Sequence, residues 1–149
     1  ISAWLRKGEI QAREIDIAEF DKRKFKNALA EIKELAFLTH DDFTHPLQSI
    51  CAKCGVAVVF TQNLPKAPIS SATRWFHNKP IIQFSSRCGT NDHFWFTFFH
   101  EAAHIILHGK KDIFLGNVEG IEIDQEKEEE ATAFAVKILL KENRTAINY

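Results

Sequence analysis

A short motif of histidine and glutamate offers the clearest chemistry in the sequence: His100-Glu101-Ala102-Ala103-His104. Residues four apart on a helix share one face, so the two imidazoles can reach one cation. Zinc binds neutral histidine nitrogens and, in catalytic sites, keeps one coordination position for water. The glutamate beside the first histidine can take a proton from that water, as in the H-E-x-x-H zinc peptidases. The motif predicts zinc bound by His100 and His104, with Glu101 as the general base.

The segment around the motif predicts a buried helix. Residues 94–108 read FWFTFFHEAAHIILH, which is apolar nearly all the way round and is typical of a core helix. Its polar residues fall on one stripe: Thr97, His100, Glu101, His104 and His108. Burying such a stripe is costly unless something satisfies it, and a metal ion with its water would do so. The alternative is a buried helix with satisfied core histidines and an end-of-helix His108.

A second helix is predicted over residues 124–140, and it offers a third ligand. Its apolar positions recur at helical spacing: Ala131, Phe134, Ala135, Ile138 and Leu139. Glu128 extends this buried stripe toward the helix start. Glu126, Glu129 and Glu130 lie off the stripe, and we expect them to complement the helix dipole in solvent. Glu128 is therefore the predicted third metal ligand.

These motifs resemble the ImmA/IrrE-type metallopeptidase domain. The resemblance lies in TRWFHNKPIIQFSSR, DHFWFTFFHEAAHIILHGKK and EEEATAFAVKILL, and covers most of the chain. Members share HExxHxxxH followed by ExxAxxFA. The matching residues are His100, Glu101, His104 and His108, then Glu128, Ala131, Phe134 and Ala135. Residues 3–9, AWLRKGE, also resemble the segment that precedes this domain in proteins with an upstream helix-turn-helix.

The resemblance implies a zinc-dependent peptidase-like domain of the kind often fused to a DNA-binding repressor or antitoxin domain. It assigns zinc to His100, His104 and Glu128, and the general base to Glu101. Thr132 stands where the family often has Asp or Asn, so an outer partner of a ligand is expected to be weaker or supplied elsewhere. The usual Met-Pro after the final leucine pair is also absent.

The order of predicted elements indicates an α+β, zincin-like fold in one domain over residues 1–149, with a helical N-terminal part at 1–40. Helices are expected at 2–15, 22–38 and 44–54, strands at 56–60, 70–76 and 80–84, and a loop with a short strand at 113–123. The strands at 70–76 and 80–84 form a hairpin around His77-Asn78-Lys79. The strand at 70–75 is expected to offer an open edge for an extended peptide. Gly55 and Gly109 are expected to end helices, and Asn91 or Asp92 to begin one.

The composition limits the kinds of partner that the domain is expected to bind. The net charge of −1 gives no case for binding nucleic acid or membranes by whole-chain electrostatics. No apolar run approaches the roughly 18 residues of a membrane span. The chain starts at Ile1 and contains no methionine, so we expect a fragment of a longer protein whose upstream domain would supply any DNA binding. The expected partner of this domain is a protein or peptide substrate.

Three cysteines cannot pair fully, which favours a reducing, cytoplasmic location. Cys51 and Cys54 form a C-x-x-C that could be redox-active or half of a zinc site. No second C-x-x-C completes such a site, so core packing near a helix end is the favoured interpretation. Cys88 stands alone.

Two classes of function stay open. The first is a zinc peptidase that cuts a specific protein in bacterial transcriptional or stress regulation. The second is a zinc-binding regulatory module that binds a partner and cleaves nothing. The residue that stabilises the oxyanion is not identified. His108 could line the cleft, cap the helix or compete with Glu128, and weaker candidates are His77, His93, Arg74 and Tyr149.

Overall fold

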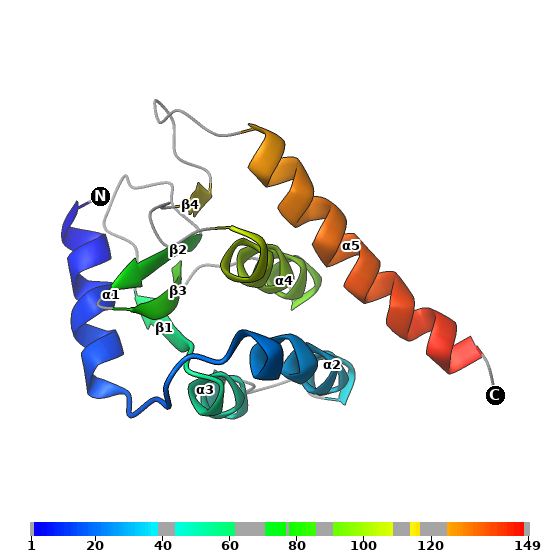
Figure 1. The fold of residues 1–149 in the computed structure, drawn as a ribbon, viewed down its shortest axis with the longest axis horizontal. Helices are drawn as coiled ribbons and strands as arrows, with labels where there is room; N and C mark the ends of the chain where they lie inside the picture. Colours follow the sequence, from blue (N-terminus) through cyan, green and yellow to red (C-terminus); the bar gives the residue numbers. More distant parts are fainter. Residues whose placement is uncertain are drawn as a thin grey trace.

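The computed structural model describes residues 2–38, 44–61, 71–76, 78–85, 91–108, 114–116 and 125–147. Three helices precede three strands, and a helix, a short strand and a last helix follow, in the α+β order that the sequence predicts (Figure 1). The elements are α1 Ser2–Glu14, α2 Lys22–Leu38, α3 Thr44–Lys53, β1 Ala57–Thr61, β2 Ser71–Phe76, β3 Lys79–Ser85, α4 Asn91–Leu107, β4 Phe114–Gly116 and α5 Gln125–Ile147. α5 runs seven residues beyond the predicted end at residue 140.

The four strands form one sheet in the order β1-β3-β2-β4. β1 and β3 are parallel, whereas β2 is antiparallel to both β3 and β4. The predicted hairpin is confirmed: β2 ends at Phe76, which pairs with Lys79 at the start of β3. Asn78 adopts a φ of 66°, a left-handed conformation that asparagine tolerates better than most residues.

The expectation of an open edge on β2 is wrong for its first half. β4 pairs antiparallel with Ser71 to Thr73, so β2 is an interior strand there. At the opposite edge of the sheet, side chains bond the carbonyl groups of β1: Gln48 donates to Val58 and Gln11 donates to Phe60. Such side-chain bonds protect an edge from pairing with other chains. β4 forms the other edge of the described sheet.

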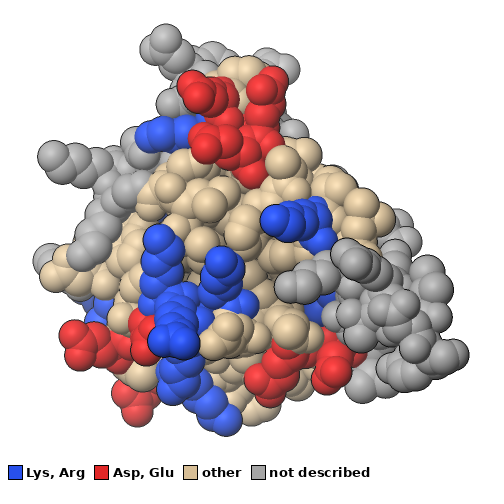
Figure 2. Space-filling view, turned by 45° about the vertical axis from the view of Figure 1, so that its right-hand side comes forward, with Lys and Arg blue, Asp and Glu red and all other residues tan. Residues whose placement is uncertain are grey.

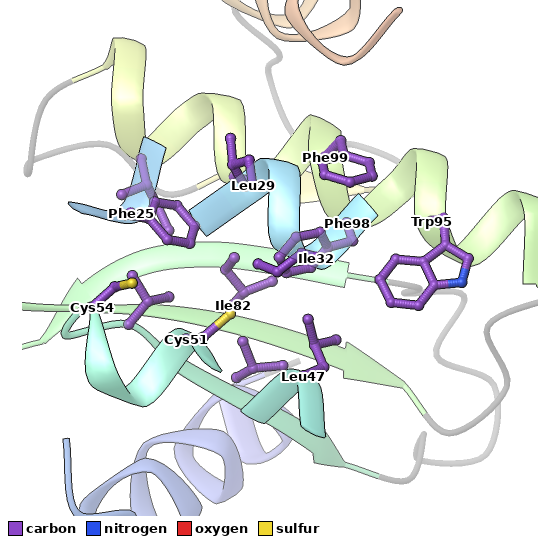
Figure 3. Close-up of a cluster of buried hydrophobic side chains, with 14 of the residues drawn as sticks. Phe25, Leu29, Ile32, Leu47, Cys51, Cys54, Ile82, Trp95, Phe98 and Phe99 are labelled. Carbon is purple, nitrogen blue, oxygen red and sulfur yellow. The ribbon is translucent and has the colours of Figure 1, made fainter. Parts of the chain in front are cut away.

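The larger core lies between the sheet and three helices (Figure 3). α2 contributes Phe25, Leu29 and Ile32, and the apolar side of α4 covers them with Trp95, Phe98 and Phe99. These side chains are all nearly inaccessible to solvent, as expected for a helix that is apolar almost all round. This packing fixes α4 rigidly against the sheet.

α1 covers the other face of the sheet (Figure 1), where Ala12 packs against Ala57, Val59 and Ile81. Gly8 permits a close approach, since a Cβ there would lie 2.1 Å from the side-chain oxygen of Gln83. The Gln83 amide in turn donates to the Trp4 carbonyl at 2.7 Å. A glycine and a buried amide therefore set the distance between α1 and the sheet.

The end of α3 explains the C-x-x-C. Gly55 has a φ of 86°, and the bonds Gly55 N–H to Ala52 and Val56 N–H to Cys51 close the helix in a Schellman pattern. Cys51 and Cys54 are both free thiols in the core, which confirms the packing interpretation. Burial raises the pKa of each thiol, so neither favours the reactive thiolate. Cys88 lies outside the described residues.

None of the described helices is both long and apolar enough to cross a membrane.

Candidate metal centre

α4 presents its histidines to α5. The two helices pack against each other, and His100, His104 and His108 recur every four residues along the facing side of α4. Across from them, Ala131 and Ala135 are fully buried, so the predicted inward stripe of α5 is confirmed. Glu128 extends that stripe toward the start of α5 and reaches the histidines.

The three predicted ligands lie together. His100 Nε2 and His104 Nε2 are 3.3 Å apart. The two carboxylate oxygens of Glu128 lie 2.9 Å from His100 Nε2 and 3.1 Å from His104 Nε2. Donors placed about 2.0–2.1 Å from a tetrahedral zinc ion are separated by about 3.3 Å. The three side chains therefore fit a metal ion with only a few tenths of an ångström of adjustment, and they form the one such cluster among the described residues.

The electrostatics of the cluster favour a cation. Burial raises the pKa of Glu128, but hydrogen bonds and charge from the two histidines lower it to about 2 overall. Burial lowers the pKa of His100, while its hydrogen bond to Glu128 and the charges of Glu101 and Glu128 raise it above the ordinary value. Glu128 is thus ionised over the whole physiological range, as a metal ligand must be.

Both histidines have partners on their outer nitrogens. His100 Nδ1 lies 3.3 Å from the Thr132 hydroxyl, so the outer partner that was expected to be weaker or supplied elsewhere is the threonine itself. His104 Nδ1 lies 3.0 Å from His108 Nδ1. His108 Nε2 then lies 3.4 Å from Glu130 Oε1. The sequence placed Glu130 in solvent; it is exposed, but its carboxylate also reaches the site.

Glu101 turns to the sheet rather than to α5. Its side chain is 2% exposed, and both carboxylate oxygens accept hydrogen bonds from β2, from the Ser71 hydroxyl and, at 2.8 Å, from the Thr73 hydroxyl. Burial raises the pKa of Glu101, and these hydroxyls with His100 and His104 offset part of that rise. The sequence analysis missed the two hydroxyls. Ser71 and Thr73 stand two residues apart on one strand, and this alternation was the sequence signal that could have identified them.

The other candidate site residues lie outside the cluster of three ligands or outside the described residues. His108 contacts the side of the His104 ring that faces away from Glu128, so it does not compete for the carboxylate's position. Arg74 is buried under α1, where it bonds the Leu5 carbonyl and pairs with Glu9. His77, Tyr149 and Gly109 lie outside the described residues, and the side chains of residues 91–93 lie outside them too.

The surroundings of the site are acidic. Glu126, Glu129 and Glu130 are exposed at the start of α5. Figure 2 shows acidic side chains gathered at that end of the molecule. Negative charge in the first turn is stabilised by the helix dipole, and it also raises the local concentration of cations.

An H-E-x-x-H helix joined by a carboxylate from the next helix defines a metallopeptidase-type domain. The comparison with protein families agrees, because the model of the IrrE N-terminal-like domain (Peptidase_M78) matches residues 51–146. The match covers more than half of the chain, so the chain belongs to this ImmA/IrrE family. A search of curated proteins found no significant match.

Proposed function

We propose that this domain is a zinc-dependent metallopeptidase with a zincin-like site, in which His100, His104 and Glu128 bind the metal. The observation that carries the proposal is the convergence of these three side chains from two helices, at separations that suit tetrahedral zinc. Two imidazoles and one carboxylate are the ligands of a catalytic zinc site with an open position, whereas structural zinc sites normally have four protein ligands. The substrate is a specific protein, cleaved in the cytoplasm during bacterial transcriptional or stress regulation.

Glu101 is the proposed general base. A bound zinc ion would polarise the substrate carbonyl and acidify water at the site. Glu101 takes a proton from the attacking water as the water oxygen bonds to the carbonyl carbon. It then returns the proton to the nitrogen as the C–N bond breaks, giving a carboxylic acid and an amine. Its raised pKa suits a group that both accepts and donates a proton.

A second candidate is a regulatory zinc module that binds a partner without cleaving it, attached to a DNA-binding or antitoxin domain upstream. The state of Glu101 favours it: the carboxylate is buried, and hydroxyl groups occupy both oxygens. The peptidase proposal requires Glu101 to exchange at least one of these bonds for water when substrate binds. Apo hydrogen bonds of catalytic groups often rearrange in this way.

Metal content of the purified chain is the first test. We compare the wild type with Glu128→Ala and with the matched control Glu129→Ala, whose side chain is exposed. Near-stoichiometric zinc lost only in Glu128→Ala supports the site, and no zinc in the wild type after addition of the metal overturns it. Glu101→Gln then separates the two functions. It should retain zinc and bind a substrate protein without cutting it, whereas a wild type that binds its partner and cuts nothing is the regulatory module.

A further inference from the structure

His108 and Glu130 lie behind the metal centre and form a line with His104. The His104 side chain is fully buried, with Nε2 toward Glu128 and Nδ1 toward His108 at 3.0 Å. On its far side, His108 Nε2 faces Glu130 Oε1 at 3.4 Å. The His108 side chain is only 5% exposed, whereas that of Glu130 is 54% exposed.

The positions of the protons on His104 and His108 follow from the role of the His104 ring. In the metal-free cluster His104 Nε2 faces the Glu128 carboxylate, but with a metal ion bound His104 would offer a lone pair on Nε2 and carry its proton on Nδ1. A buried N–H requires an acceptor, and His108 Nδ1 is one at hydrogen-bond distance. His108 then carries its own proton on Nε2, where the carboxylate of Glu130 accepts it. With the opposite tautomer of His108, two N–H groups would face each other across 3.0 Å.

We propose that His108 is a positioning residue, which with Glu130 fixes the tautomer and ring orientation of His104 so that Nε2 faces the metal. This inference rests on the proposed metal site. Outer partners of metal-binding histidines typically change metal affinity by about 10- to 100-fold. The role also explains why His108 lies beside the cluster although it is not one of the three predicted ligands and is turned away from Glu128.

The test is the dissociation constant for Zn²⁺, measured on the full chain by competition with a chromophoric chelator. His108→Leu removes the acceptor and should raise the dissociation constant about 10- to 100-fold. His108→Asn should restore most of the affinity, because its amide oxygen can accept the His104 proton. Glu130→Gln should weaken binding by less than His108→Leu, and the matched Glu129→Gln should leave it unchanged.

Cobalt spectroscopy distinguishes positioning from ligation. The visible absorption of Co²⁺ at saturation should be the same in wild type and His108→Leu, since the three ligands are retained. A changed spectrum would make His108 a ligand and overturn the inference, as would equal zinc affinities of the wild type and His108→Leu. Circular dichroism of the metal-free variants reports folding, and the Glu130 and Glu129 pair carries the test if His108→Leu is unfolded. A wild type that binds no zinc overturns the proposed function itself. A wild type that binds zinc, with variants of equal zinc affinity, overturns only the inference about His108.

Discussion

The hydroxyl groups that hold Glu101 lead to a quantitative prediction for Thr73→Val. Thr73 donates to Glu101 at 2.8 Å in a fully buried setting, and valine has nearly the same shape without the donor. A hydrogen bond to an ionised acceptor contributes about 1.5–3 kcal/mol, and one between neutral groups about 0.5–1.5 kcal/mol. We therefore expect Thr73→Val to lower the free energy of unfolding by about 2 kcal/mol at a pH where Glu101 is ionised. In a Glu101→Gln background the loss should be about 1 kcal/mol.

The assay is a double-mutant cycle by urea unfolding of the metal-free protein, with wild type, both single variants and the double variant. The expected coupling energy is about 1 kcal/mol, and thermal melting should show the same order at about 2–4 °C per kcal/mol. Equal losses in the two backgrounds would show that the Thr73 hydroxyl does not bond an ionised Glu101, which refutes the reasoning.

The same cycle has a defined dependence on pH. Burial raises the pKa of Glu101 in the folded state, so the fold favours the protonated acid. Stability from this group is present below its ordinary pKa of 4.5 and is lost as the pH rises through the folded value. Glu101→Gln cannot ionise, so its stability relative to wild type should increase from pH 5 to pH 8. A constant difference over that range would contradict the raised pKa.

Three further predictions concern the site, the α1 interface and the thiols. Burial lowers the pKa of His100, but the hydrogen bond to Glu128 and the charges of Glu101 and Glu128 together raise it above the ordinary 6.5. Acidification should therefore begin to lower the zinc affinity at a pH above 6.5, as measured by chelator competition from pH 8 to 5.5. Gly8→Ala places a methyl group 2.1 Å from the Gln83 side chain and should cost about 1–3 kcal/mol in urea unfolding, whereas an unchanged midpoint would show that α1 shifts freely. Cys51 should react with a thiol reagent only after unfolding, because it is buried with a raised pKa, and rapid labelling of the native protein would contradict this.

Periodicity predicted the parts of the site that depend on one helix at a time. The helical spacing of His100 and His104 placed both imidazoles on one side of α4, and the phase of Glu128 relative to Ala131 identified the one glutamate that faces inward. The sequence also predicted that the two helices converge, because both stripes had to be buried and their polar side chains required partners.

Features that depend on how the strands pair were not predictable in this way. The sequence near residue 114 indicates a short strand but not its partner, and its pairing with Ser71 to Thr73 turned an expected edge into the middle of the sheet. That pairing, in turn, keeps the hydroxyl-bearing half of β2 inside the sheet, beneath α4. The partners of Glu101 therefore depend on a long-range contact that no local pattern encodes.

The polar stripe of α4 is satisfied on two sides, and this division explains how a nearly apolar helix can carry it. Toward α5, His100 and His104 meet the carboxylate of Glu128, which leaves a concentrated negative charge that suits a cation. Toward the sheet, Glu101 meets neutral hydroxyls, which solvate a carboxylate without fixing its proton. The helix separates these two environments because adjacent residues diverge by about 100°, so the carboxylates of Glu128 and Glu101 meet different sides of α4.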